Sequence, residues 1–340
     1  MGLVVRSACA ALMLLVLLPC RTSAGASAAQ FLASIQPAPE LQAFLDRAID
    51  ELRAADSKLR QTKLRIALLD LSGDPPRLAH YQGETPVYPA SVVKFVYLMA
   101  AYKWQEDGRL QIDAQLDEQL TEMIRHSGNR ATQQVFARLT NTEQGPELAG
   151  DAYGAFRAHR LAVKEWLVSM GITDLHCVNP TYDGDGDLYG RDKQFLQDGT
   201  VAGGLPSREG DFSNRQAMTA AGTAKLLALL ATDRALSPED SSTVRRRMRR
   251  DPGEQPYLVP RLAGGAARLA GLEVFSKSGT WGPIYADAGI VRHVSGKQLI
   301  LVVFTDSSPP YRGDFIADLT ERVAARLLRS PVPAQNSIAP

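Results

Sequence analysis

Cysteine is nearly absent from the part of the chain that folds. The 340 residues contain three cysteines: Cys9 and Cys20 near the N-terminus, and Cys177 by itself. A lone cysteine cannot form an internal disulfide, so packing of apolar side chains must stabilise the fold. The five histidines are scattered, and no Cys/His cluster has the spacing of metal ligands. The sequence therefore argues against a zinc hydrolase and predicts neither a metal nor a cofactor.

The sequence also lacks an excess of charge of either sign. Its formal net charge is +1 and 22% of its residues are charged, so nothing indicates a nucleic-acid partner. No internal repeat is evident. Apolar residues make up 45% of the chain, as in an ordinary globular protein with a substantial core. We expect a monomer.

The first 24 residues have the pattern of an export signal. Arg6 provides a positive start, and residues 8–18 form an apolar run that is too short to span a membrane. Cleavage is expected after the small residues Thr22-Ser23-Ala24 or Ala26-Ser27-Ala28. The sequence therefore predicts a protein exported to the periplasm or beyond, with no transmembrane segment once the signal is removed.

Cys20 raises the alternative of a lipid anchor. Lipidated cysteines normally follow a small residue, whereas Cys20 follows Pro19. The sequence does not favour lipid attachment.

Hydrophobic periodicity predicts a helix, a strand pair, a helical block, a strand meander and a closing helix. The expected helices are 38–59, 91–105, 116–124, 131–139, 153–170, 217–231, one from Ser237 onward, and 315–328. The expected strands are 64–71, 78–82, 272–276, 286–293 and 298–305. Residues 177–213 show no periodicity and are predicted to form a long functional loop. The basic run 245–250 is interpreted as a solvated helix C-terminus, and 331–340 as a disordered tail.

Ser91 and Lys94 are the first candidates for chemistry. Ser91 would begin a helix, and Lys94 would lie one turn later on the same face. A serine hydroxyl needs a neighbouring base to become a nucleophile, and a buried lysine with a lowered pKa can serve as that base. A helix cap followed by a surface lysine would give the same four-residue pattern.

Two further motifs support the chemical interpretation. Ser127-Gly128-Asn129 lies in a link between predicted helices, and Lys277-Ser278-Gly279-Thr280 follows a predicted strand. Ser-x-x-Lys, Ser-x-Asn and Lys-Ser-Gly in this order form the signature of penicillin-recognising serine enzymes. Over about residues 38–330 the chain resembles a class A β-lactamase, or a close relative in the serine β-lactamase and penicillin-binding protein superfamily.

The resemblance implies an α+β fold, an α/β sandwich plus a helical domain. About five mostly antiparallel strands would be flanked by the N- and C-terminal helices. The catalytic domain would span 25–340, with its sheet part at about 38–88 and 270–330. Its helical part would be at about 91–265, and the active site would lie in the cleft between the two parts.

The resemblance also implies how an acyl-enzyme would form. Ser91 would attack an amide-type carbonyl, and Lys94 would accept its proton or position a proton relay. Ser127 would pass a proton to the leaving nitrogen. The backbone N–H groups of Ser91 and Thr280 would stabilise the oxyanion.

Substrate binding is implied in the same way. Asn129 would bind the amide of the substrate side chain. Lys277 would supply positive potential toward the substrate carboxylate, and Ser278 and Thr280 would offer it hydroxyl groups. Gly279 would allow the ligand to approach the backbone closely.

The chain departs from the family in its expected loop. The Glu-x-x-Leu-Asn motif, whose glutamate activates the deacylating water in class A enzymes, is absent. Asp183 is the candidate replacement base. Asp183, Asp185 and Asp187 also resemble the start of a calcium loop, but Leu188 and Gln194 stand where that loop needs glycine and glutamate. A solvated acidic turn is the third interpretation.

Three hypotheses about function follow. The chain is a serine hydrolase acting on β-lactam or related amide carbonyls, with a small-molecule or peptidoglycan-derived substrate. Alternatively it is a D-alanyl-D-alanine peptidase or penicillin-binding relative that deacylates slowly. The third hypothesis is a non-catalytic sensor or binding module on the same fold.

Overall fold

The computed structural model describes residues 24–184 and 188–328. The export signal and the C-terminal tail were predicted for residues that lie almost entirely outside these ranges. The described chain begins with α1 (Ala24–Ser34), which packs against α9 (Ala220–Ala231). No helix within the described ranges combines the length and apolar character needed to cross a bilayer.

A six-stranded sheet forms one half of the molecule, with the order β1-β3-β2-β8-β7-β6. The strands are β1 (Gln36–Pro37), β2 (Lys63–Asp70), β3 (Arg77–Tyr81), β6 (Leu272–Trp281), β7 (Ile284–His293) and β8 (Gln298–Asp306). Five are antiparallel to their neighbours, as expected from the sequence. The sixth, β1, pairs in parallel with β3. The expectation of about five strands missed it because a two-residue strand has no periodicity.

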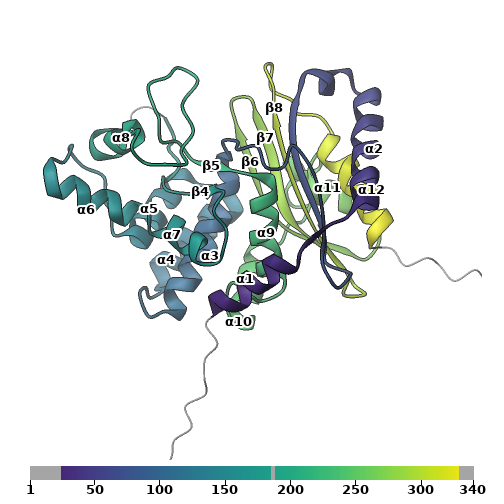
Figure 1. Ribbon diagram of the computed structural model, residues 1–340, viewed down its shortest axis with the longest axis horizontal. Helices are drawn as coiled ribbons and strands as arrows, with labels where there is room; N and C mark the ends of the chain where they lie inside the picture. The colour runs from purple at the N-terminus through teal and green to yellow at the C-terminus, as the bar shows by residue number, and fades with distance from the viewer. Residues whose placement is uncertain (1–23, 185–187, 329–340) are drawn as a thin grey trace, which may run out of the picture.

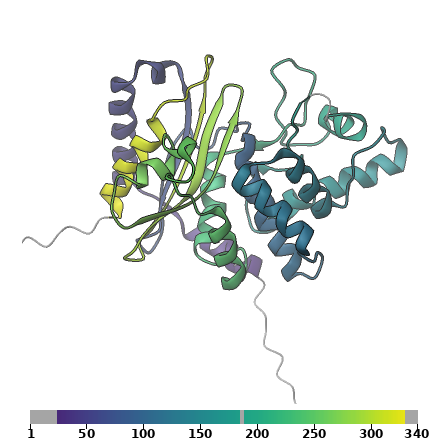
Figure 2. The ribbon, with the colours of Figure 1, turned by 180° about the vertical axis from the view of Figure 1, so that it is seen from behind.

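The sheet is buried on both faces, and β8 shows why. Its residues 299–304 form a continuous apolar run, as expected for a strand covered on two sides. Leu299, Leu301 and Val303 belong to one core cluster, and the residues between them belong to the other. Helices α2 (Pro39–Ala55), α11 (Leu262–Ala266) and α12 (Phe315–Leu327) cover the first face, and α9 covers the second (Figures 1 and 2).

The helical half lies beyond α9 (Figure 1). It consists of α3 (Lys94–Glu106), α4 (Ala114–Thr121), α5 (Asn129–Thr140), α6 (Gly150–Arg160), α7 (Ala162–Ser169), α8 (Gly190–Gln197) and α10 (Pro238–Met248). The prediction of one helix over 153–170 was wrong, because α6 and α7 are separate. Leu161 lies between the two helices with φ −82° and ψ −8°. Because this ψ is far from the value of a regular α-helix, the helix is interrupted at Leu161. Sequence periodicity alone does not detect such a break.

The segment 177–213 was predicted to have no regular structure, and this was wrong in part. It contains α8, whose eight-residue sequence is too short and too polar for a periodic signal. The buried residue Asp192 in α8 forms an ion pair with buried Arg160 at the end of α6. A small sheet of β4 (Leu175–His176) and β5 (Ala217–Met218) closes the ends of the segment. Tertiary contacts therefore give this segment its structure.

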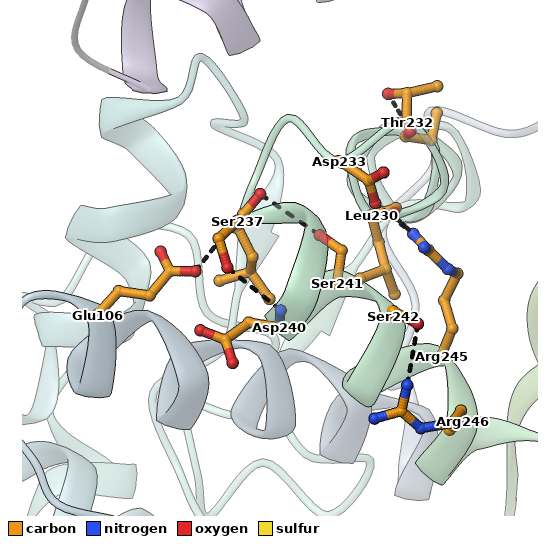
Figure 3. A network of polar contacts seen from close by, with 12 residues as sticks. Glu106, Leu230, Thr232, Asp233, Ser237, Asp240, Ser241, Ser242, Arg245 and Arg246 are labelled. Atoms are coloured by element: carbon orange, nitrogen blue, oxygen red, sulfur yellow. Dashed lines mark hydrogen bonds and ion pairs between the residues drawn. The ribbon is translucent and has the colours of Figure 1, made fainter. Parts of the chain in front are cut away.

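The basic run 245–250 is only partly the solvated helix end that was predicted. Arg245 lies in the last turn of α10 and contacts Asp233 and the carbonyl of Leu230, both at 2.6 Å (Figure 3). At the other end of α10, Ser237 Oγ accepts a hydrogen bond from the backbone of Asp240 (Figure 3). Arg250, by contrast, is only 5% exposed. It points into the protein toward β6, which brings it to the cleft described next.

Candidate active site

The turn that carries Ser91 is held against the edge strand of the sheet. Ser91 lies in a 3₁₀ turn, η2 (Ala90–Val93), which runs directly into α3. Gly279 of β6 passes so close that a Cβ atom there would lie 2.8 Å from the carbonyl oxygen of Pro89 and 3.1 Å from the backbone nitrogen of Val92. Only glycine permits this approach. Strand β6 extends to Trp281, so the Lys-Ser-Gly motif lies within the strand rather than after it.

Lys94 is completely buried at the first residue of α3. Its Nζ donates to the carbonyl oxygen of Ser127 at 2.5 Å and to Asn129 Oδ1 at 2.7 Å. Burial lowers the pKa of Lys94 to about 7, and the nearby carboxylates of Asp183 and Glu122 oppose that shift. A substantial fraction of Lys94 is therefore a neutral amine near neutral pH.

Ser127 lies between two buried amines. It adopts a left-handed conformation with φ 62° at the end of the π-helical turn η3 (Glu122–His126). Its Oγ accepts a hydrogen bond from Lys277 Nζ at 3.0 Å and lies 3.4 Å from Lys94 Nζ. The structure thus brings both lysines and the Ser-x-Asn motif together from segments far apart in the sequence.

Two buried arginines surround Lys277, and sequence reasoning missed both. Arg250 donates from Nε to the carbonyl oxygen of Ser276 at 2.9 Å. Arg261 donates to Thr280 Oγ1 at 2.6 Å and stacks on the ring of Tyr285 at 4.1 Å. Burial, together with the positive charges of Arg250, Lys94 and Arg261, lowers the pKa of Lys277 well below its usual value. Arginines keep their charge, so these two guanidinium groups hold the positive charge at this end of the cleft.

Asp287 is an acidic group whose charge acts on both Lys277 and Arg250. It is fully buried on β7, opposite Ser278 of β6. Its carboxylate accepts hydrogen bonds from Ser276 Oγ at 3.3 Å and from the backbone of Leu262 at 3.2 Å. Its charge raises the pKa of Lys277. The sequence pattern gave no indication that Asp287, within an otherwise apolar strand, would lie next to the cleft.

A cavity of about 660 Å³ opens over the motif residues. Its walls include Ser91, Ser127, Asn129, Ser278 and Thr280, with Arg261 at the same end as Thr280. The residues Ser91, Ser127 and Arg261 therefore line one space. This volume is in the range of small-molecule sites.

Asp183 lies close to this cavity, on the side of Asn129. Asn129 Nδ2 donates to the carbonyl oxygen of Tyr182 at 3.2 Å, which ties the 181–183 segment to α5. The charge of Asp183 acts on Lys94, so its carboxylate is within electrostatic reach of the candidate base. Asp185 and Asp187, the other two residues of the calcium-loop interpretation, lie outside the described residues. In residues 24–184 and 188–328, no three His, Cys, Asp or Glu side chains gather closely enough to hold a metal ion.

Solved structures of β-lactamases have the same fold. A β-lactamase from Sphaerobacter thermophilus is 16% identical, with a TM-score of 0.58 over 85% of this chain and 99% of the other. A β-lactamase from Chitinophaga pinensis is 17% identical, with a TM-score of 0.57 over 83% and 98%. The protein PBP-A is 17% identical, with a TM-score of 0.55 over 86% and 97%. The fold is thus that of the β-lactamase-like α+β proteins. A search of curated proteins found no match.

The family is defined by a further comparison. The profile described as "Beta-lactamase enzyme family" matches residues 45–328, which cover every strand of the large sheet except β1, the cleft and all three motifs. The chain belongs to the beta-lactamase enzyme family. The motif-based resemblance and the expected fold class are both confirmed.

Proposed function

We propose that the protein is a serine hydrolase that opens β-lactam or related amide carbonyls through an acyl-enzyme on Ser91. The observation that carries this proposal is the buried amine of Lys94. Its pKa is lowered to about 7, and it lies one turn from Ser91. A base poised near the working pH is what activation of a serine hydroxyl requires.

In the proposed mechanism, Lys94 takes the proton of Ser91 as Ser91 Oγ forms a bond to the substrate carbonyl carbon. The C–N bond then breaks, and Ser127 donates its proton to the leaving nitrogen. The Lys94 ammonium formed in the first step then reprotonates Ser127, whose Oγ lies 3.4 Å from Lys94 Nζ. The proton taken from Ser91 is thus balanced by the proton given to the leaving nitrogen, while Lys277, 3.0 Å from Ser127 Oγ, orients that hydroxyl.

The substrate carboxylate would bind at the opposite end of the cavity. The hydroxyls of Ser278 and Thr280 line this end, and Arg261 Nη2 lies 2.6 Å from Thr280 Oγ1. A guanidinium that keeps its charge attracts a carboxylate more reliably than a lysine of lowered pKa. We therefore assign the main electrostatic attraction to Arg261, with Lys277 acting mainly on Ser127.

A slow-deacylating relative remains the second candidate function. The missing glutamate motif favours it, and an acyl-enzyme complex with penicillin G has been solved for a variant of the structurally similar PBP-A. A D-alanyl-D-alanine peptidase or penicillin-binding protein would use the same Ser91 chemistry. The two candidates differ in how fast water releases the acyl group.

Intact-mass measurement after addition of a penicillin, a cephalosporin and a D-Ala-D-Ala peptide tests the proposal. We expect an adduct on Ser91 with at least one of the three compounds, and no adduct on Ser91→Ala. An adduct that disappears as product accumulates identifies a hydrolase, and one that persists identifies the slow-deacylating relative. Absence of both labelling and product formation would instead support the non-catalytic binding module.

Asp183 is proposed to activate the deacylating water. Its charge reaches Lys94, and its segment is bonded to α5 through Asn129. Asp183→Asn should therefore slow release of the acyl group by about 10²- to 10⁴-fold while acylation continues. The mass-spectrometric time course separates the two steps. Asp174→Asn is the control, because Asp174 does not line the cavity. Unchanged release in Asp183→Asn would rule out this assignment.

We further propose that the protein is exported and that residues 1–24 are removed in the process. The support is the sequence pattern of that segment. Mass measurement of the protein recovered from the cell envelope or medium tests this directly.

A further inference from the structure

A second cavity of about 560 Å³ adjoins the first and shares Asn129 with it. It lies between the end of β6 and residues of 179–184 and 188–216, which belong to the long segment that departs most from the family pattern. Because Asn129 is where the substrate side-chain amide is proposed to bind, the side chain beyond that amide would extend into this space. The groups that line the cavity therefore bear on which acyl donors fit.

Arg215 is the cation of this cavity. Its guanidinium lies against the rings of both Tyr88 and Trp281, at 4.1 and 4.9 Å from their centroids. The two rings contact each other at 5.2 Å. No ion pair joins Arg215 to a carboxylate in the ranges that the structure describes. The rings and a hydrogen bond with Tyr88 fix the orientation of the guanidinium, and its five N–H donors leave others for a planar carboxylate.

Two buried amide side chains, Asn179 and Gln216, add acceptors. Both line the cavity and are 2% exposed. Their nitrogens are used, since Asn179 Nδ2 donates to the carbonyl oxygen of Asn214 at 2.8 Å and Gln216 Nε2 donates to that of Asn179 at 2.5 Å. Their oxygens accept no hydrogen bond from the described residues. Buried oxygens without a hydrogen bond are unfavourable, and a ligand with N–H donors would satisfy them.

Three carboxylates complete the lining: Asp183, Glu209 and Asp211. Ser207 donates to Asp211 Oδ1 at 2.8 Å, which orients that side chain. Among the lining residues that the structure describes, three carboxylates against one guanidinium give a negative balance with one positive point. A purely anionic ligand would be repelled, and an apolar one would leave the buried amide oxygens unpaired.

We propose that this cavity binds the side chain of the acyl donor and selects side chains that end in an amino-acid centre with both an ammonium and a carboxylate group. The carboxylate pairs with Arg215. The ammonium is held by the surrounding carboxylates and the oxygens of Asn179 and Gln216. This inference rests on the proposed function. Diamino-acid residues of peptidoglycan stem peptides and β-lactams with an aminoadipyl chain share this chemistry.

The test uses one cephalosporin nucleus with four side chains. They are D-α-aminoadipyl, with both charges; glutaryl, with the carboxylate only; 5-aminopentanoyl, with the ammonium only; and phenylacetyl, with neither. The second-order rate constant for acylation of Ser91 is measured by intact mass. We expect the aminoadipyl compound to react at least about tenfold faster than the phenylacetyl compound, as one well-formed charged contact allows.

Substitutions assign the preference to the cavity. Arg215→Gln should reduce the aminoadipyl-to-phenylacetyl rate ratio about tenfold. Asp211→Asn should reduce the aminoadipyl-to-glutaryl ratio. Arg109→Gln is the matched control, because Arg109 stacks on Trp104 at 4.2 Å outside both cavities, and it should leave both ratios unchanged.

Each outcome of these experiments either supports or overturns the proposed side-chain selectivity. Equal rates for the four compounds, or a preference for one charge alone, would overturn the inference while leaving the Ser91 chemistry intact. Neither labelling nor product formation with any of the four would overturn the proposed function itself. Protection of Ser91 by a stem-type peptide with a free amino-acid centre, but not by its N-acetylated form, would support the inference and identify peptidoglycan as the source. A retained aminoadipyl preference without such protection would support it for β-lactams.

Discussion

Lys94→Ala is expected to lower the rate constant for acylation of Ser91 by about 10²- to 10⁴-fold. The wild-type rate should rise with pH through about 7 and level off above it. The reason is that only the neutral amine can accept the serine proton, and burial lowers the pKa of Lys94 to about 7. The measurement is acylation by a penicillin from pH 5 to 9, because the penicillin carboxylate stays ionised throughout.

The matched control is Lys103→Ala. Lys103 lies on the same helix, and its amine pairs with Asp107 at 2.7 Å away from the cleft. Its loss should leave both the rate and the pH profile unchanged. A wild-type profile that is flat between pH 6 and 9, or a Lys94→Ala variant that acylates at the wild-type rate, would rule out Lys94 as the base.

Arg160→Ala is expected to lower the free energy of unfolding by about 3–5 kcal/mol, because it leaves the charge of Asp192 buried without its partner. Arg160 is 2% exposed and Asp192 is 0% exposed. The guanidinium also lies 4.8 Å from the ring of Phe156, so packing is lost as well. Urea unfolding followed by circular dichroism gives the change.

Arg157→Ala on the same helix is the control. Arg157 pairs with Asp198 at 3.7 Å with a side chain that is largely in solvent, so its loss should cost no more than about 1 kcal/mol. The double variant Arg160→Leu/Asp192→Leu should be more stable than Arg160→Ala, since it removes both charges together. If Arg160→Ala and Arg157→Ala lower the free energy of unfolding equally, the buried Arg160–Asp192 pair does not stabilise the fold in this way.

The catalytic motifs could be predicted from the sequence because each is short, local and tied to one type of element. Ser91 and Lys94 lie one turn apart, so their proximity follows from helix geometry alone. The strands of the sheet were predictable for a similar reason, since apolar runs bounded by turns indicate them. Only the length of β6 and the brief β1 were missed.

Residues whose role depends on distant partners could not be predicted. Arg250 has the sequence context of a solvated helix end, and only the fold shows that it reaches the carbonyl oxygens of Ser276 and Ile124. Arg261 and Asp287 likewise stand in stretches with no distinctive pattern. Helix α8 forms because Asp192 pairs with Arg160 across 32 positions of sequence. Whether a charged side chain is buried depends on tertiary contacts, so it cannot be predicted from local sequence periodicity.

The cluster of apolar side chains beneath the cleft limits how this protein can adapt to ligands. It is continuous from the sheet, through Phe275 and Ile284, to the helical half, through Phe95 and Leu116. Two bodies joined by a linker can rotate about a hinge, but two halves that share one close-packed interior resist such rotation. The width of the cleft should therefore change little when ligands bind. Ligands of different size would then be accommodated by residues at the rim of the cleft, above all those of 177–184 and 188–216.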